Sequence, residues 1–360
     1  MFREGELTVR LGVQANRIRS VDIASTRTPL PARLTQGRTV EDVERTIPLL
    51  FSICARAQGA AASAALVAAQ GLTTDAGQFA RRSDDVRREA IVELLTRLLI
   101  DWPKVLGASA DVPAVARIRQ APPGSQLDVC REISRERVFG VDASRWLAAM
   151  TTEVLGRWIT EGASLPARLL QQLQTDVPDL GRSGIEEMPN AGVEGVNRIL
   201  PAPGADTGFS RTPHWLGKPV ETGSLARQAH HPLLAAFVTQ YGNTVSARFL
   251  AQLVELATWL APGATPTGVV QQYTVAEGIG LGLAETARGL LLHQAQVSEG
   301  RVEHYRIVAP TEWNFHPGGA LTQGLVGRPV RNAADARGRA ALLVQALDPC
   351  VACTIEVADA

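Results

Sequence analysis

A run of small residues, Ala60–Ala69, most limits how this chain of 360 residues can fold. Alanine is the best helix former, and small side chains let neighbouring elements approach a helix closely. The run therefore predicts a central, buried helix. We expect it to extend from 44–50 through Cys54, with a kink at Pro48, and to end near Gly71.

Helical patterns dominate the rest of the sequence. Thr39 is expected to cap the first helix, because a threonine followed by acidic residues favours a helix start. Two pieces of β structure are expected: a hairpin or small sheet within 6–25, and a hairpin made by 289–297 and 302–308. Further helices are expected at 74–106, 142–158, 163–175, 222–239, 244–260 and 332–347, and loops at 26–38 and 177–206.

The order of these elements indicates a mainly α fold with small β pieces, of the α+β class. The sequence lacks the strand–helix–strand alternation of a parallel α/β fold, and it lacks repeats. We expect one domain over 1–360, long enough to bury a sizeable core. Its parts are an N-terminal β region (1–38), a helical core (39–262), a β-hairpin region (263–330), and a terminal helix with a cysteine loop (331–360).

Composition excludes several classes of function. The 36 basic and 36 acidic residues balance, so no basic surface for nucleic acid is expected. The apolar runs are too short to cross a membrane. The first ten residues, MFREGELTVR, lack the apolar stretch of a signal peptide, so a cytoplasmic location is expected. Four cysteines in a chain of this length do not make a disulfide framework.

The cysteines are the first candidates for chemistry. Cys350 and Cys353 are separated by two residues and follow a proline, so a turn can direct both sulfurs to one point. The pair suits a soft metal or a redox couple, or it is two buried thiols at a turn. Cys54 is either a core residue or a thiolate favoured by Arg56, two residues away. Cys130 has no partner nearby in the sequence, which predicts a structural role.

Other motifs narrow the chemistry further. The histidines show no zinc-hydrolase spacing, and the sequence has neither a phosphate-binding loop nor a nucleophile elbow. Arg288 precedes the predicted hairpin and Thr311 follows it after a proline. A guanidinium and a fixed hydroxyl would suit a small anionic ligand, or they are a surface arginine and a turn threonine.

Taken in order, these segments resemble motifs of the large subunit of nickel–iron hydrogenases. Segment 348–353 (DPCVAC) matches the late cysteine motif of that family, and 285–293 (ETARGLLLH) resembles its E-A-P-R-G-x-L-x-H motif. Segment 310–314 (PTEWN) matches its P-T-x-W-N motif, and 223–227 (GSLAR) resembles G-P-L-A-R. The helix into Cys54 resembles the approach to the early cysteine motif. The resemblance spans nearly the whole chain and implies a large-subunit-like fold.

The resemblance also implies a bimetallic site that this chain does not complete. In the family, four cysteines bind nickel and an iron that carries CO and two cyanides. Aligning Cys54 with the first cysteine places Ala57 at the second, a bridging ligand. The motif histidines become Ala61 and Glu356, and an acid implicated in proton transfer falls near Ala32. Nickel binding, hydrogen oxidation and the C-terminal cleavage of hydrogenase precursors are therefore not expected.

What the resemblance implies instead is an iron-holding site. Cys54, Cys350 and Cys353 match three family ligands and are expected to hold an Fe(CN)2CO unit. Arg288 and Thr311 match residues that hydrogen-bond the cyanides. A large-subunit look-alike with these losses is similar to maturation proteins of the HupK/HoxV type. This implies a non-catalytic scaffold or carrier whose partners are HypC/HypD-type proteins and the hydrogenase large subunit.

Three other functions stay open. A divergent, active nickel–iron hydrogenase-like oxidoreductase would contain nickel, and Ala57 speaks against it. A cofactor-free relative of the quinone-binding subunit of respiratory complex I would have lost the cysteines. A metal-free interaction protein would occupy a maturation partner by mimicry, and metal analysis separates it from a carrier.

Overall fold

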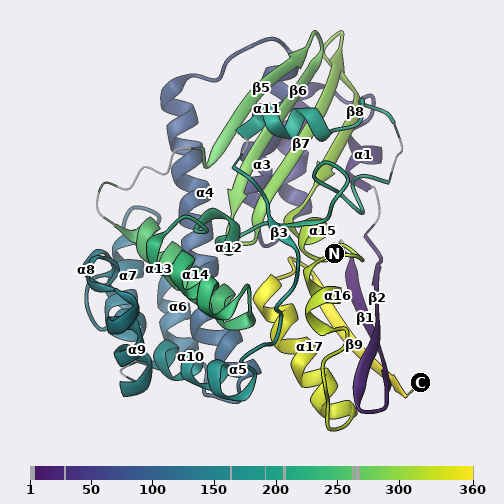
Figure 1. Cartoon of the computed structure of the whole chain (residues 1–360). Helices are drawn as coiled ribbons and strands as arrows, with labels where there is room; N and C mark the ends of the chain where they lie inside the picture. The colour runs from purple at the N-terminus through teal and green to yellow at the C-terminus, as the bar shows by residue number, and fades with distance from the viewer. Residues whose placement is uncertain are drawn as a thin grey trace.

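The computed structural model describes residues 5–27, 30–162, 164–190, 192–205, 208–261, 263 and 268–359. Expectations that concern residues 1–4, 28–29, 163, 191, 206–207, 262, 264–267 and 360 lie outside this part of the chain. The described part is mainly helical and contains three small sheets, so the expected α+β class is confirmed (Figure 1). Within it, no helix has the length and apolar character needed to cross a membrane.

The largest sheet is a four-stranded antiparallel meander, with strand order β5-β6-β7-β8. Its strands are β5 (Val270–Ala276), β6 (Ile279–Thr286), β7 (Gly289–Ser298) and β8 (Arg301–Val308). The predicted hairpin is β7 and β8. The sequence analysis missed β5 and β6, because glycines interrupt the apolar pattern of β6.

The alanine-rich helix α3 (Ala55–Ala69) packs against one face of this sheet (Figure 1). Two glycines of β6 make the close contact possible. A Cβ on Gly280 would lie 2.2 Å from the carbonyl oxygen of Ala65, and a Cβ on Gly282 would lie 2.0 Å from that of Ala61. The small residues on both elements thus let the backbones of helix and strand approach each other.

The single helix expected from 44 to 71 is wrong. The chain forms α2 (Val40–Thr46), the 3-10 turn η1 (Ile47–Leu50) and a non-helical link before α3 begins. Pro48 in η1 lacks the N–H that would continue an α-helix, and Phe51 takes extended backbone angles. The predicted cap is confirmed, because the Thr39 side chain accepts the N–H of Asp42 at 3.2 Å. The break places Cys54 at the N-cap of α3.

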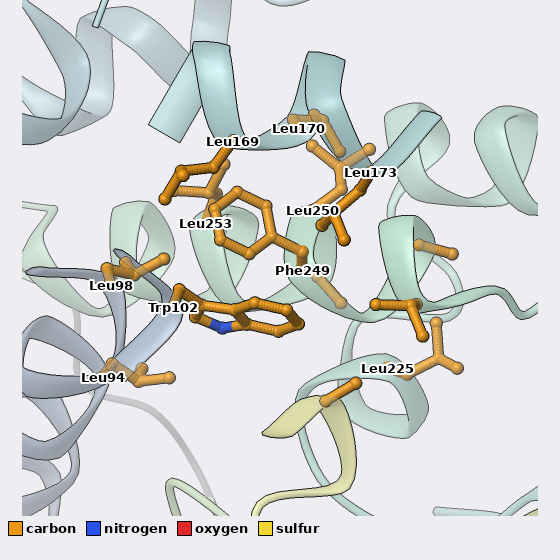
Figure 2. Packing of buried hydrophobic residues seen from close by; sticks show 14 of the residues in the cluster. Leu94, Leu98, Trp102, Leu169, Leu170, Leu173, Leu225, Phe249, Leu250 and Leu253 are labelled. Atoms are coloured by element: carbon orange, nitrogen blue, oxygen red, sulfur yellow. The ribbon is translucent and has the colours of Figure 1, made fainter. Parts of the chain in front are cut away.

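Helices form the second part of the molecule around α14 (Val245–Leu260), which is buried along most of its length. The predicted 74–106 helix is α4 (Ala76–Thr96), the π-helical turn η2 (Arg97–Asp101) and α5 (Trp102–Val105). Figure 2 shows how α5 meets α14: Trp102 packs edge-on against Phe249, with ring centroids 4.9 Å apart. The indole N–H of Trp102 donates to Gln252 at 2.8 Å, so its polar atom is satisfied inside the core.

The remaining helices correct several boundaries. Segment 142–158 is two helices, because Thr151 caps a new one, and 222–239 is also two, the second starting at Pro232. The expected loops 26–38 and 177–206 contain short helices and a strand. These helices are α1 (Leu30–Thr35), α6 (Val112–Gln120), α7 (Gln126–Ile133), η3 (Ser134–Phe139), α8 (Ala143–Ala149), α9 (Thr152–Glu161), α10 (Leu165–Asp176), α11 (Gly192–Ile199), α12 (Ser224–Arg227), α13 (Pro232–Tyr241), α15 (Pro310–Asn314), α16 (Ala320–Leu325) and α17 (Ala333–Leu347).

A three-stranded sheet joins the two ends of the chain. The predicted N-terminal hairpin is β1 (Glu6–Gln14) and β2 (Arg17–Ser25), and β9 (Ala352–Asp359) pairs with β1 in parallel. The expected C-terminal cysteine loop is therefore only partly right, because Cys353 belongs to β9. A further two-stranded sheet pairs β3 (Glu186–Glu187) with β4 (Val220–Glu221).

Candidate functional site

Cys350 lies in a turn between α17 and β9. Asp348 takes a left-handed conformation (φ 50°) that ends α17 and reverses the chain. The buried Cys350 Sγ receives a hydrogen bond from Arg27 Nη2 at 2.7 Å and lies 3.0 Å from Thr311 Oγ1. Because Thr311 Oγ1 also accepts the Cys350 N–H at 3.0 Å, its own hydrogen is free to point at the sulfur. The sulfur thus has a guanidinium and a hydroxyl as its polar neighbours.

Cys54 lies at the N-cap of α3 and interacts electrostatically with Cys350. Burial raises the pKa of its thiol, and the charges of Cys350 and Glu89 act in the same direction. Arg288 and a hydrogen bond from Gln58 oppose that shift. Cys54, Cys350 and Arg288 therefore lie within one electrostatic neighbourhood, although 296 residues separate the two cysteines.

Arg288 lies in the turn between β6 and β7 and is buried. Its Nη2 donates to Glu93 at 2.9 Å, and its Nε lies 3.5 Å from Asp348, which also pairs with Arg97 at 2.7 Å. Burial alone would lower the pKa of Arg288, but the carboxylates of Asp348 and Glu93 outweigh burial, so the pKa of Arg288 is raised. Among the described residues, Arg288 Nε is a buried donor without a hydrogen-bond acceptor. The charge is thus fixed beside the cysteines.

Cys353 is placed differently from the other predicted site residues. It lies in β9 opposite Leu7 of β1, on the face of the strand that packs against the main core. Burial raises the pKa of its thiol to about 11, and Glu6 adds to the shift. The structure thus places Thr311 in contact with Cys350, while Cys54 and Arg288 interact with Cys350 electrostatically, and Cys353 lies in β9 with Glu6 as a charged neighbour. In the described ranges, no three His, Cys, Asp or Glu side chains are grouped as metal ligands.

Cys130 is fully buried in the main core, as predicted.

A cavity of about 540 Å³ opens next to Cys350. Arg27 and Thr311, which contact the sulfur, are part of its wall. The charged residues of the wall are four arginines and two glutamates, so positive charge is in excess: Arg27, Arg33, Arg211, Arg306, Glu303 and Glu312. Cys350 is not itself part of the wall, and it lies behind Arg27 and Thr311.

The positions where the family motifs are broken have other roles. Ala57 is buried in the first turn of α3, and its N–H donates to Glu89 at 3.1 Å. Ala61 lies against β6. Glu356 is exposed on β9 and pairs with Arg10 at 2.9 Å, while Ala32 lines the cavity. Ala57 and Ala61 belong to the same buried apolar cluster as Cys54, so they pack where the family has metal-site side chains.

Sequence reasoning missed three residues of this site. Arg27 and Glu89 carry no motif, because only the tertiary fold brings them to the cysteines. Gln58 follows Cys54 by four residues on α3, a spacing that places two side chains on one helix face. That spacing was the one available signal.

The buried carboxyl group of Glu89 makes the stability of the protein depend on pH. It accepts the N–H groups of Arg56 and Ala57 at the start of α3, but burial dominates and raises its pKa from 4.5 to about 7. The unfolded chain thus loses this proton at a lower pH than the folded chain. We expect the free energy of unfolding to fall as pH rises from about 4.5 to about 7 for this reason.

Chemical denaturation of Glu89→Gln across this pH range measures that contribution. The difference between wild type and variant should change with pH in the stated direction. Glu153→Gln, at an exposed carboxylate on α9, serves as the control and should leave the pH profile of the wild type in place. Identical profiles for Glu89→Gln and wild type would contradict a raised pKa.

Comparison with known proteins shows similarity over the whole chain. The chain is 30% identical to the hydrogenase expression/formation protein HoxV of Cupriavidus necator, covering 100% of this chain and 98% of that protein. It is 31% identical to the hydrogenase expression/formation protein HupV of Azotobacter chroococcum, with 99% of both chains covered. It is 29% identical to HupK of Rhizobium leguminosarum, with 98% of this chain and 94% of that protein covered. Residues 236–356 match the family described as nickel-dependent hydrogenase.

Solved structures show the same fold at lower identity. A reduced, active Ni-Fe-Se hydrogenase from Desulfomicrobium baculatum superposes with a TM-score of 0.59 at 15% identity, over 94% of this chain and 95% of that chain. An oxidised Ni-Fe-Se hydrogenase from D. vulgaris Hildenborough gives 0.58 at 16% identity, over 94% of both chains. The predicted large-subunit-like fold is thereby confirmed.

Proposed function

Because the chain belongs to the family of hydrogenase expression/formation proteins that includes HoxV and HupV, we propose that it is a non-catalytic hydrogenase maturation factor. Its cargo is an iron that carries one CO and two cyanides, the Fe(CN)2CO unit. The protein holds this unit and passes it to the large subunit of a hydrogenase. Cys54, Cys350 and Cys353 are the proposed thiolate ligands, and Arg288 and Thr311 are proposed to orient the cyanides.

The observation that carries this proposal is the set of donors around Cys350. The Cys350 sulfur receives a hydrogen bond from a guanidinium and lies beside a hydroxyl, and both groups can stabilise the negative charge that a sulfur carries when it binds a soft metal. Cys54 lies in the same electrostatic neighbourhood. Iron with thiolates and cyanides carries negative charge. The buried Arg288 interacts electrostatically with both cysteines, and its Nε makes no hydrogen bond among the described residues, although it lies 3.5 Å from Asp348.

The proposed ligand set also supports a non-catalytic role. A bimetallic centre needs bridging thiolates to fix two metals together, and Ala57 supplies none. The relatives are named as expression/formation proteins rather than as enzymes. An incomplete set of protein ligands suits a carrier, because CO and cyanide fill the other positions and the unit can leave again.

The cavity beside Cys350 is the proposed path of the cargo. Its arginines would attract an anionic iron unit, and its wall already includes the residues that hold the Cys350 sulfur. HypC/HypD-type maturation proteins are the proposed donors and the hydrogenase large subunit is the proposed acceptor. Pull-down with each of these proteins, before and after loading, tests these partners.

Infrared spectra test the cargo. The protein is purified without oxygen from a host that makes the hydrogenase, and CO and cyanide bands are expected together with iron. Cys350→Ala and Cys54→Ala should each lose the bands, and Cys353→Ala tests the third ligand separately. Cys130→Ala is the matched control, since this cysteine is buried in the core away from the site.

The outcomes separate the candidate functions. Wild-type protein without CO or cyanide bands, or bands that persist in a Cys350→Ala/Cys353→Ala double variant, would refute the carrier. About one nickel per chain with hydrogen-dependent dye reduction would instead identify an active oxidoreductase. Partner binding without any metal would identify an interaction protein.

A further inference from the structure

A chain of buried polar side chains leads from the cavity wall to Cys54. Tyr305 on β8 lines the cavity, and its hydroxyl lies 2.8 Å from Nδ1 of His293 on β7. His293 Nε2 lies 2.9 Å from Oε1 of Gln58, one turn beyond Cys54 on α3. Gln58 Nε2 lies 3.7 Å from Cys54 Sγ. His293 and Gln58 are exposed by 0% and 1%, so solvent does not compete for these bonds.

The chemistry of each group fixes the direction of donation along this series of hydrogen bonds. The amide oxygen of Gln58 can only accept, so His293 carries its hydrogen on Nε2. His293 Nδ1 is then an acceptor, and the Tyr305 hydroxyl donates to it. The amide NH2 of Gln58 donates to the sulfur of Cys54. Each donor in the series therefore points towards Cys54.

We propose that Gln58, His293 and Tyr305 are positioning residues that hold and tune the Cys54 sulfur as an iron ligand. This inference rests on the proposed function and adds the residues that control one of its ligands. A hydrogen bond to a thiolate withdraws electron density from the sulfur and so weakens its donation to the metal. Successive donors strengthen one another in a low-dielectric interior.

The buried surroundings keep His293 and Tyr305 uncharged. Burial lowers the pKa of His293 to about 3, so the ring is neutral near pH 7 and keeps one acceptor nitrogen. Burial also raises the pKa of Tyr305, which therefore remains a hydroxyl donor. The neutral series can donate towards a thiolate without placing a second charge beside it.

The direction of the series is tested without cargo. The protein labelled with 15N-histidine is studied by NMR in the metal-free state, and His293→Gln assigns the signal among the six histidines. We expect a neutral His293 ring with its hydrogen on Nε2. A hydrogen on Nδ1 would reverse the series, with Gln58 accepting from the thiol, and would overturn the inference whatever the protein carries.

The effect on the ligand is tested in the loaded protein by infrared spectroscopy and iron analysis. In Gln58→Leu the sulfur loses its donor, so the CO band should move to lower wavenumber and metal affinity should fall by about 10- to 100-fold. Tyr305→Phe removes only the first donor of the series and should shift the CO band by a smaller amount in the same direction. This variant keeps the test available if Gln58→Leu does not fold. Gln70→Leu is the control, because the Gln70 amide on the same helix donates only to the Leu66 carbonyl.

These results distinguish the two proposals. A CO band that is unmoved in Gln58→Leu and Tyr305→Phe, or that moves equally in Gln70→Leu, overturns the role of the series. A wild-type protein without CO or cyanide bands overturns the carrier function. In that case the NMR measurement still decides the direction of the hydrogen bonds.

Discussion

Replacing Asp348 by alanine is expected to lower the free energy of unfolding by about 3 kcal/mol. The carboxylate is buried between two arginines, 2.7 Å from Arg97 and 3.5 Å from Arg288, and its removal leaves both guanidinium groups less compensated. The expected loss is at the lower end of the range for broken buried pairs, because Asp101 and Glu93 remain as second partners. Alanine also tolerates the left-handed backbone at this position less well than aspartate.

Urea denaturation measures this loss. Asp348→Asn separates the two causes, because asparagine keeps the backbone preference and loses the charge. The matched control is Asp22→Ala, which breaks an exposed pair with Arg10 and should cost less than about 1 kcal/mol. Equal effects at the two positions would show that the buried carboxylate does not hold the arginines.

The second large effect is expected at Gly282. In Gly282→Ala the new Cβ would lie 2.0 Å from the backbone carbonyl oxygen of Ala61, and a backbone atom cannot rotate away as a side chain can. Helix α3 must therefore move off the sheet, at an expected cost of about 3 kcal/mol, the upper end for overpacking. Because Cys54 is the N-cap of this helix, the displacement should also move the proposed iron ligand Cys54.

Gly156→Ala is the control for that substitution. Gly156 is an exposed residue within α9, and a Cβ there meets no atom within 4 Å, so alanine should stabilise the helix by up to about 1 kcal/mol. Thermal or urea unfolding of both variants provides the comparison. A Gly282→Ala protein as stable as wild type would mean that helix and strand can separate without loss.

Local signals predicted the elements whose cause is local. Thr39 caps its helix as predicted, and the β7–β8 hairpin follows from its turn and alternation. Strand β6 escaped prediction because its glycines serve a contact with α3 that no local pattern reveals. Strand β9 escaped because its reason to be extended is a partner at the other end of the sequence.

The residues of the site also fall into those that the sequence indicated and those that only the tertiary structure reveals. Motif resemblance selected Cys350, Arg288 and Thr311, and in the structure Thr311 contacts Cys350 while Arg288 interacts with it electrostatically. It could not indicate Arg27, whose contact with Cys350 depends on the sheet that joins the chain ends. Nor could it show that Cys353 lies in a strand and packs against the main core, because register is a property of the paired strands.

The parallel pairing of β9 with β1 has a consequence for synthesis. On the ribosome, β1 and β2 emerge first, and the strand that completes their sheet emerges last, more than 300 residues later. The turn that carries Cys350 cannot meet Cys54 and Arg27 before that strand is released. Closing so long a loop is slow compared with forming the helices between its ends. The group of side chains around Cys350 is therefore a late product of folding, and a nascent chain that lacks β9 does not yet present it.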